Sequence, residues 1–369
     1  MKSASIEEII LLKNCDSICH FETNSDYSLD GNEIASQISL CIQKCVNIQS
    51  LKLNLSLTNL DIENYNLLGQ RISQLNNLNA LEIYLYGNKI GVQKMKSLLE
   101  NISKCQYLES LNLQLSQNDL KDQGCSILGN SISSLCKLKF LTIDISKNYI
   151  GSNGSQNIGN SFINFKKLKS LYLDIGWNKI GDDGGYKLFQ YLYEINNLSN
   201  LSLYFSGNSI TSVGISKIGE KLLKCQNLTN LYLNLEMNQI SDTGVLKIVS
   251  SIVRMSCLKH LNLNFRDCGI TDLGLGQFGQ EISKIQSLIC LKLSFSSNQI
   301  NLNGAVLLSK HISKIKRLLA LKLKMKQLLF LKIFTKFFNI RACQLSKEYS
   351  KIVQKIYKGK YLINYELKI

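Results

Sequence analysis

A leucine recurs every thirty residues through most of this chain, and this spacing constrains the fold more than any other feature. Ten leucines share the column without a shift: Leu51, Leu81, Leu111, Leu141, Leu171, Leu201, Leu231, Leu261, Leu291 and Leu321. A fixed period of about 20–50 residues is typical of solenoids, in which one small unit is repeated and stacked. Such a unit buries its apolar side only against its neighbours, so we expect one elongated domain rather than several globular ones.

Each thirty-residue unit combines a strand pattern with a helix pattern. Leu171, Leu173 and Ile175 alternate with outward positions, which predicts a strand with one apolar face. Leu188 and Leu192 follow at helical spacing, which predicts a helix packed against that strand. Strands that are joined through helices at this spacing run parallel. The pattern therefore predicts an α/β solenoid with a parallel sheet on one side and helices on the other.

The alternation also predicts opposite effects for two adjacent substitutions. Leu173→Asp would place an unpaired charge in the shared core and unfold several neighbouring units. Asp174→Ala changes an outward position, so we expect it to be nearly silent for stability.

Three further columns mark the turn between strand and helix. An asparagine recurs at positions 88, 118, 148, 178, 208, 238 and 298, replaced by Thr58 and Cys268 in two units, and its inward side chain would hydrogen-bond turn backbone. A polar column predicts the helix N-caps: Asp122, Ser152, Asp182, Ser212, Asp242 and Asp272. A glycine column two residues later, from Gly124 to Gly304, indicates close backbone packing.

Together these columns resemble a leucine-rich repeat of the ribonuclease-inhibitor-like subclass. The motif is carried by Leu168, Leu171, Leu173, Ile175, Asn178, Ile180, Gly184 and Leu188, and it extends over roughly residues 21–325. The resemblance implies a curved parallel sheet on the concave side and helices on the convex side. Asn178 lies five positions after Leu173 rather than three, which predicts a longer strand with Ile175 as an additional inward residue.

Both ends of the chain depart from the repeat. Residues 1–20 are predicted to be an N-terminal capping segment with a short helix over the first repeat. Residues 21–50 are predicted to be a degenerate unit that keeps its helix and loses its strand. The solenoid then spans residues 21–325, with a last strand at 321–325, and residues 326–369 are predicted to be a basic C-terminal cap or tail.

The tail carries much of the charge of the chain. Residues 321–369 contain 12 Lys or Arg and two acidic residues, within a net charge of +16 for the whole sequence. As a cap, the tail would cover the last repeat with its phenylalanines and leave its lysines in water. As a second hypothesis, its lysines and aromatic rings would make a minor contact with anionic lipid or nucleic acid. The third hypothesis is a disordered end.

Composition points to a reducing compartment and to no bound cofactor. Cysteines such as Cys45 and Cys105 occupy apolar helix positions, so we expect core-filling thiols rather than disulfides. The pair Cys15 and Cys19 has no second half at a suitable spacing, so no metal is predicted. The first fifteen residues lack the features of a signal peptide, which predicts a cytoplasmic protein.

Outward strand positions are the candidate binding surface. Tyrosine and arginine dominate binding hot spots, although tyrosine also suits strands for reasons of propensity. The candidates on the concave face are Tyr84, Tyr86, Asp144, Tyr172, Asp174, Tyr204, Tyr232 and Arg266. Because adjacent strands lie ~4.8 Å apart, Tyr172, Tyr204 and Tyr232 should line three consecutive strands, and Asp144 should lie beside Asp174.

No motif in the sequence predicts catalysis or a small-molecule substrate. Phosphate-binding loops, kinase motifs and the nucleophile elbow are missing, and the three histidines are far apart in the sequence. The predicted function is therefore a protein–protein interaction scaffold that binds a partner of unknown identity on its concave face. The resemblance implies an alternative, a regulator of another enzyme, either a small-GTPase activator or an enzyme inhibitor.

Overall fold

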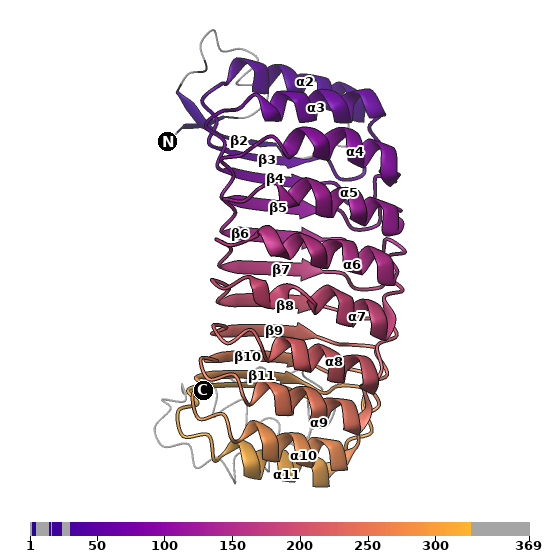
Figure 1. Cartoon of the computed structure of the whole chain (residues 1–369), viewed down its shortest axis with the longest axis vertical. Coiled ribbons are helices and arrows are strands. Elements are labelled where there is room, and N and C mark those ends of the chain that lie inside the picture. Colours follow the sequence, from indigo (N-terminus) through magenta and orange to yellow (C-terminus); the bar gives the residue numbers. More distant parts are fainter. Residues whose placement is uncertain (1, 5–14, 16, 24–29, 326–369) are drawn as a thin grey trace, which may run out of the picture.

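Twelve parallel strands form a single sheet in the computed structural model, which describes residues 2–4, 15, 17–23 and 30–325. Within these ranges the strands are β1 (Lys2–Ala4), β2 (Ile18–Thr23), β3 (Ser50–Asn54), β4 (Ala80–Tyr84), β5 (Ser110–Gln114), β6 (Phe140–Asp144), β7 (Ser170–Asp174), β8 (Asn200–Tyr204), β9 (Asn230–Asn234), β10 (His260–Asn264), β11 (Cys290–Ser294) and β12 (Ala320–Lys324). Figure 1 shows them stacked in chain order, with the helices in a second layer.

The helices connect successive strands. They are α2 (Gly31–Lys44), α3 (Ile62–Ser73), α4 (Gly91–Ile102), α5 (Lys121–Ser133), α6 (Ser152–Ser161), α7 (Gly181–Phe189), α8 (Ser212–Leu222), α9 (Ser241–Ile252), α10 (Asp272–Ile282) and α11 (Leu302–Ile312). Short 3-10 helices, η1 (Phe162–Asn164) and η2 (Leu192–Glu194), follow α6 and α7. In the described ranges, no helix has both the length and the apolar character that crossing a bilayer requires.

The register of the sheet confirms that the thirty-residue units are stacked in sequence order. Leu171 in β7 pairs with Leu141 in β6 and with Leu201 in β8, so the leucine column crosses the sheet in a straight line. The additional inward residue is also confirmed, because Ile175 is fully buried. Its N–H donates to the carbonyl of Tyr204 at 3.0 Å, so bonding between the strands continues past the end of β7.

The first units differ from what the sequence predicted. The unit at residues 21–50 has not lost its strand, because β2 pairs with β3 and places Phe21 opposite Leu51. Phe21 is 1% exposed and fills the leucine position with a larger apolar side chain. Residues 2–4 form a strand on β2 rather than part of a capping helix. Most of the predicted cap and all of residues 326–369 lie outside the described residues.

The asparagine column forms a ladder of hydrogen bonds between successive turns. Asn178 donates from Nδ2 to the carbonyls of Ile145 and Ile175, at 3.1 and 2.9 Å. Its Oδ1 accepts from the N–H groups of Asn148 and Ile150, at 2.9 and 3.0 Å. Asn178 therefore satisfies backbone groups of its own unit and of the preceding unit, as a buried turn requires.

Both substitutes in the asparagine column keep part of this bonding. The hydroxyl of Thr58 donates to the carbonyl of Leu55 at 2.8 Å. The thiol of Cys268 donates to the carbonyl of Leu235 at 3.1 Å, and burial raises the pKa of this thiol to about 12. Cys268 thus stays a neutral, weak donor in the place of an amide.

The prediction of helix N-caps from the Asp and Ser column is wrong. Asp182 lies inside α7, and its carboxylate accepts from the backbone N–H and the hydroxyl of Thr211, at 2.7 and 2.6 Å. Asp242 makes the same pair of bonds with Thr271 in the following unit. The aspartates therefore tie each helix start to the next one rather than capping their own helix.

The same contact explains four glycines of the column, Gly154, Gly214, Gly274 and Gly304, where an added Cβ would meet an aspartate of the preceding unit. A Cβ on Gly214 would lie 2.1 Å from Oδ1 of Asp182, and one on Gly274 would lie 2.0 Å from Oδ1 of Asp242. Where the preceding unit has serine in place of that aspartate, a Cβ on Gly184 or Gly244 would lie 2.8 or 3.0 Å from the backbone Cα of Ser152 or Ser212, so the prediction of close backbone packing is confirmed.

Candidate protein-binding face

The candidate residues lie on the face of the sheet that is turned away from the helices, which we call the strand face. Alternate residues of each strand point outward there, as the pleat of a sheet requires. The described strands divide the eight candidates among three places: β4 with its following turn, the centre from β6 to β9, and the turn after β10.

Three tyrosines form a continuous stack at the centre of the strand face. The rings of Tyr172 and Tyr204 have centroids 5.0 Å apart, and those of Tyr204 and Tyr232 are 4.6 Å apart. The small side chain of Ser202 lies between Tyr172 and Tyr232 in the register, which leaves room for Tyr204. The predicted neighbourhood is confirmed, and we call these three residues the tyrosine stack.

The two outer members of the tyrosine stack, Tyr172 and Tyr232, have raised pKa values. Burial raises the pKa of Tyr172 first, and the neighbouring Tyr204 and Asp174 raise it further. Burial is also the largest cause of the raised pKa of Tyr232. The phenols of Tyr172 and Tyr232 therefore keep their protons at neutral pH and remain available both to donate and to accept hydrogen bonds.

Two carboxylates lie side by side next to the tyrosine stack. Asp144 in β6 pairs in register with Asp174 in β7, as predicted. Oδ1 of Asp174 accepts from the N–H of Gly176 at 2.9 Å, and Oδ1 of Asp144 accepts from the N–H of Ser146 at the same distance. Burial raises the pKa of Asp174 to about 6, and the charge of the nearby Asp144 also raises it. The hydrogen bond from Gly176 has the opposite effect and lowers the pKa.

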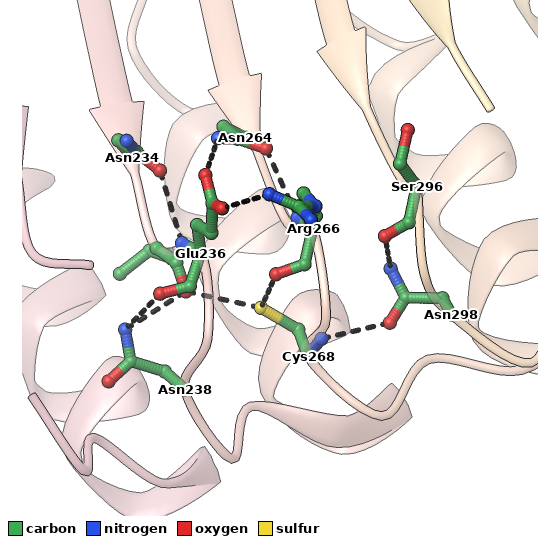
Figure 2. Close-up of polar contacts among 9 residues, drawn as sticks. Asn234, Glu236, Asn238, Asn264, Arg266, Cys268, Ser296 and Asn298 are labelled. Carbon is green, nitrogen blue, oxygen red and sulfur yellow. Dashed lines mark hydrogen bonds and ion pairs between the residues drawn. The ribbon is translucent and has the colours of Figure 1, made fainter. Parts of the chain in front are cut away.

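Arg266 is held by an acidic residue that the sequence analysis did not single out. Its guanidinium forms an ion pair with Glu236 at 2.7 Å, and Asn264 donates to the same carboxylate at 3.0 Å. Figure 2 shows Glu236 between Asn264 and Arg266 at the ends of neighbouring strands. Arg266 is thus part of a charge pair. The sequence contains a sign of this pair, because residues 236 and 266 are thirty positions apart and so occupy the same column of adjacent units.

The remaining candidates form a separate group near the N-terminal end of the sheet. Tyr84 in β4 donates to Glu82 at 2.9 Å, and Lys52 lies 6.0 Å from its ring centroid. Tyr86 follows β4 and is exposed. Three strand spacings, or about 14 Å, separate β4 from β7, so the structure does not bring this group to the tyrosine stack.

A shallow hollow beside the tyrosine stack was not predicted. It has a volume of about 260 Å³ and is lined by residues of β8 to β11, among them Asn200, Tyr232, His260 and Lys292. Asn230 donates to Asn200 within it, and leucines and Lys292 complete its lining. The binding surface predicted from the sequence does not include the first outward position of each strand, and residues at that position line this hollow.

Trp177 lies at the turn after β7 and is both packed and exposed. Its side chain covers Gly207 of the next unit, where an added Cβ would meet the ring at 2.8 Å. The residue is still 47% exposed.

No group of three or more His, Cys, Asp or Glu side chains in the described part of the chain is arranged to hold a metal ion.

Comparison with known proteins gives matches to the repeat rather than to a whole protein. The sequence profile of the leucine-rich repeat matches residues 171–189 and 224–249. No curated protein sequence matches this chain. Among solved structures, internalin C2 of Listeria monocytogenes is 19% identical, with a TM-score of 0.39, over 69% of this chain and 91% of its own.

A second similar structure is the complex of Rad7 and Elc1 from yeast. It is 15% identical, with a TM-score of 0.48, over 76% of this chain and 63% of its own. These similarities are too low to transfer a partner or an activity. The register of the sheet, the asparagine ladder and the matched repeats show that the chain has the fold of a leucine-rich-repeat solenoid.

Proposed function

We propose that the strand face binds a protein partner of unknown identity and that the chain is an interaction scaffold without a catalytic site. The tyrosine stack carries this proposal. It presents three aromatic side chains on three consecutive strands, already ordered by contact with one another. Ordered aromatic side chains lose little conformational freedom on binding, and tyrosine is among the residues that dominate binding energy.

The surroundings of the tyrosine stack support a polar protein partner. Asp144 and Asp174 border it on one side, and the hollow between Asn200 and Lys292 borders it on the other. Parallel sheets of solenoids offer extended surfaces of this kind for binding. The acidic pair would accept hydrogen bonds from basic or amide groups of the partner, and the hollow would receive a small polar side chain.

The location and the alternative function belong to the same proposal. The described cysteines are free thiols, which suits the reducing conditions of the cytoplasm. A regulator of another enzyme would use the same face, since such a protein also acts through binding. Within the described residues, no contact favours a GTPase activator over an enzyme inhibitor.

Affinity capture with matched tyrosine variants tests the proposal. Tyr172, Tyr204 and Tyr232 are changed to Ala together, and the control changes Tyr149, an exposed tyrosine away from the strand face, to Ala. We expect the first variant to lose the partner that the wild type and the control retain, with unchanged circular dichroism. Equal capture by all three proteins would exclude the tyrosine stack as the binding site.

A further inference from the structure

Positive charge gathers on one of the two edges of the solenoid. Ten segments run from the end of each helix to the start of the next strand, and we call them the loop edge: residues 43–49, 73–79, 103–109, 133–139, 163–169, 193–199, 223–229, 253–259, 283–289 and 313–319. They hold 14 of the 31 Lys and Arg of residues 30–325 and two of the 20 Asp and Glu. The other residues in this range have 17 basic and 18 acidic side chains, so the positive charge belongs to the loop edge.

Backbone hydrogen bonds hold these segments in register. The N–H of Lys139 donates to the carbonyl of Glu109, and the N–H of Lys169 donates to the carbonyl of Lys139, both at 2.8 Å. The same bond recurs along the sheet as far as Leu319. Equivalent positions therefore follow one another at the strand spacing of ~4.8 Å, so Lys139 lies beside Lys169 and Lys137 lies beside Lys167.

Helix ends explain some of these charges and leave the majority unexplained. A cation within the last turn is favoured by the helix dipole, and this effect fades beyond that turn. Six of the cations lie at a helix end or within two residues of it: Lys44, Lys104, Lys224, Arg254, Lys284 and Lys314. Eight lie four or more residues beyond an α-helix: Lys137, Lys139, Lys166, Lys167, Lys169, Lys259, Lys316 and Arg317.

Five of these eight lie in two adjacent segments and form the lysine cluster: Lys137, Lys139, Lys166, Lys167 and Lys169. Acidic neighbours neutralise only two of the five, since Glu109 pairs with Lys139 at 2.6 Å and Glu194 pairs with Lys166 at 3.4 Å. The pKa of Glu109 is lowered by the bond from Lys139 first, and then by the charges of Lys139, Lys167 and Lys137. The cluster thus keeps an excess of about three positive charges.

One exposed aromatic ring contacts the lysine cluster, and a second belongs to the residue that directly follows Lys139. Tyr107 is 60% exposed, and the ammonium group of Lys137 lies 4.2 Å from the centroid of its ring. Phe140 is 50% exposed, and its N–H donates to the carbonyl of Glu109 at 3.0 Å. Separate rings between cations suit bases that stack one at a time, whereas an anionic membrane would be met by a continuous apolar surface.

We infer that the loop edge binds single-stranded nucleic acid. The lysine cluster contacts the phosphates, and Tyr107 and Phe140 stack against the bases. A row of cations beside exposed rings is the arrangement that sequence-independent recognition of single strands uses. The lysine cluster and Tyr107 lie on the loop edge, and Phe140 is the first outward residue of β6, where the loop edge meets the strand face. None of these residues belongs to the tyrosine stack, so variants of the two sites test this inference and the proposed protein partner separately.

Fluorescence anisotropy of the full chain with labelled polyuridine RNA tests the inference. The variant changes Lys137, Lys167 and Lys169 to Gln. A matched control changes Lys89, Lys147 and Lys179 to Gln, which are exposed on the opposite edge. Both variants lose the same charge and keep residues 326–369, so any contribution of the tail is held constant.

The expected result is a selective loss in the loop-edge variant. Each phosphate contact contributes about 0.7 to the salt dependence for single strands, so the log–log slope should fall by about 2. Affinity at about 0.1 M salt should fall roughly tenfold or more, while the control stays within about twofold of the wild type. Equal binding by the loop-edge variant and the control would overturn the inference.

A second pair of variants tests the stacking independently of charge. Tyr107→Ala and Phe140→Ala should each weaken RNA binding by roughly tenfold and leave the salt slope unchanged, since each removes the stacking of one base and no charge. Unchanged affinity would contradict the assigned role of the rings. Cluster-dependent binding to phosphatidylserine vesicles, without binding to the RNA, would replace the inference with a membrane surface.

Discussion

Asp174→Asn should stabilise the protein at neutral pH, because the ionised carboxylate is held in a place that disfavours its charge. The pKa of Asp174 is raised from 3.8 to about 6, by burial and by Asp144. Asparagine already occupies the same column in β3, β9 and β10, where Asn54, Asn234 and Asn264 accept the equivalent turn N–H. The substitution therefore keeps the turn bond and removes the charge.

The magnitude follows from proton linkage. A raised pKa means that the folded state binds the proton more tightly, so the wild type gains stability as the pH falls through 6 toward 3.8. At pH 7.5 the shift from 3.8 to about 6 corresponds to at most about 3 kcal/mol of destabilisation, which Asn removes. At pH 4.5 the remaining benefit of Asn is about 1 kcal/mol, and near pH 3 it vanishes.

Urea unfolding followed by circular dichroism at pH 7.5 and 4.5 measures this difference. The control is Asp267→Asn, because Asp267 is exposed. We expect a higher unfolding midpoint for Asp174→Asn at pH 7.5, a smaller gain at pH 4.5, and no comparable change in the control. A variant that is less stable than the wild type at pH 7.5, or equally stabilised at both pH values, would refute the reasoning.

Three further predictions concern the contacts between units. Asn178→Ala leaves buried carbonyl and N–H groups without partners and should lower the free energy of unfolding by about 2–4 kcal/mol; a loss below about 0.5 kcal/mol in urea titration would contradict the ladder. Gly214→Ala should cost about 1–3 kcal/mol, because its Cβ would lie 2.1 Å from Asp182, and a double-mutant cycle with Asp182→Ala should be less than additive. Leu173→Asp should abolish the cooperative transition of several units, and native circular dichroism for this variant would be inconsistent with a shared core.

The solenoid could be predicted from the sequence because its geometry repeats in the residue spacing. Each unit contains thirty residues and one strand, so residues thirty positions apart, such as Leu171 and Leu201, pair in the sheet. The strand at Phe21 escaped prediction because an aromatic residue replaced the leucine and no alternation followed it. The bonds of Asp182 escaped prediction because a carboxylate at a helix start has two possible N–H partners, and only stacking decides between them.

The candidate site was predictable in part. Tyr172, Tyr204 and Tyr232 lie together because their columns and strand numbers determine their positions. The pairing of Arg266 with Glu236 depends on side-chain direction at the end of a strand, which residue spacing does not specify. The structure also revises the expectation that Asp174 is silent, because Asp144 and the N–H of Gly176 contact a carboxylate that the pattern placed in water.

A photo-crosslinker at residue 204 tests most directly whether the strand face is the binding surface. Replacing Tyr204 with a photoreactive phenylalanine places the label within the tyrosine stack, and the same replacement at the exposed Tyr149 is the control. The account predicts one dominant protein adduct from position 204 that is lost when Tyr172 and Tyr232 are changed to Ala, and none from position 149. Equal adducts from both positions, or an adduct from position 149 alone, would contradict it.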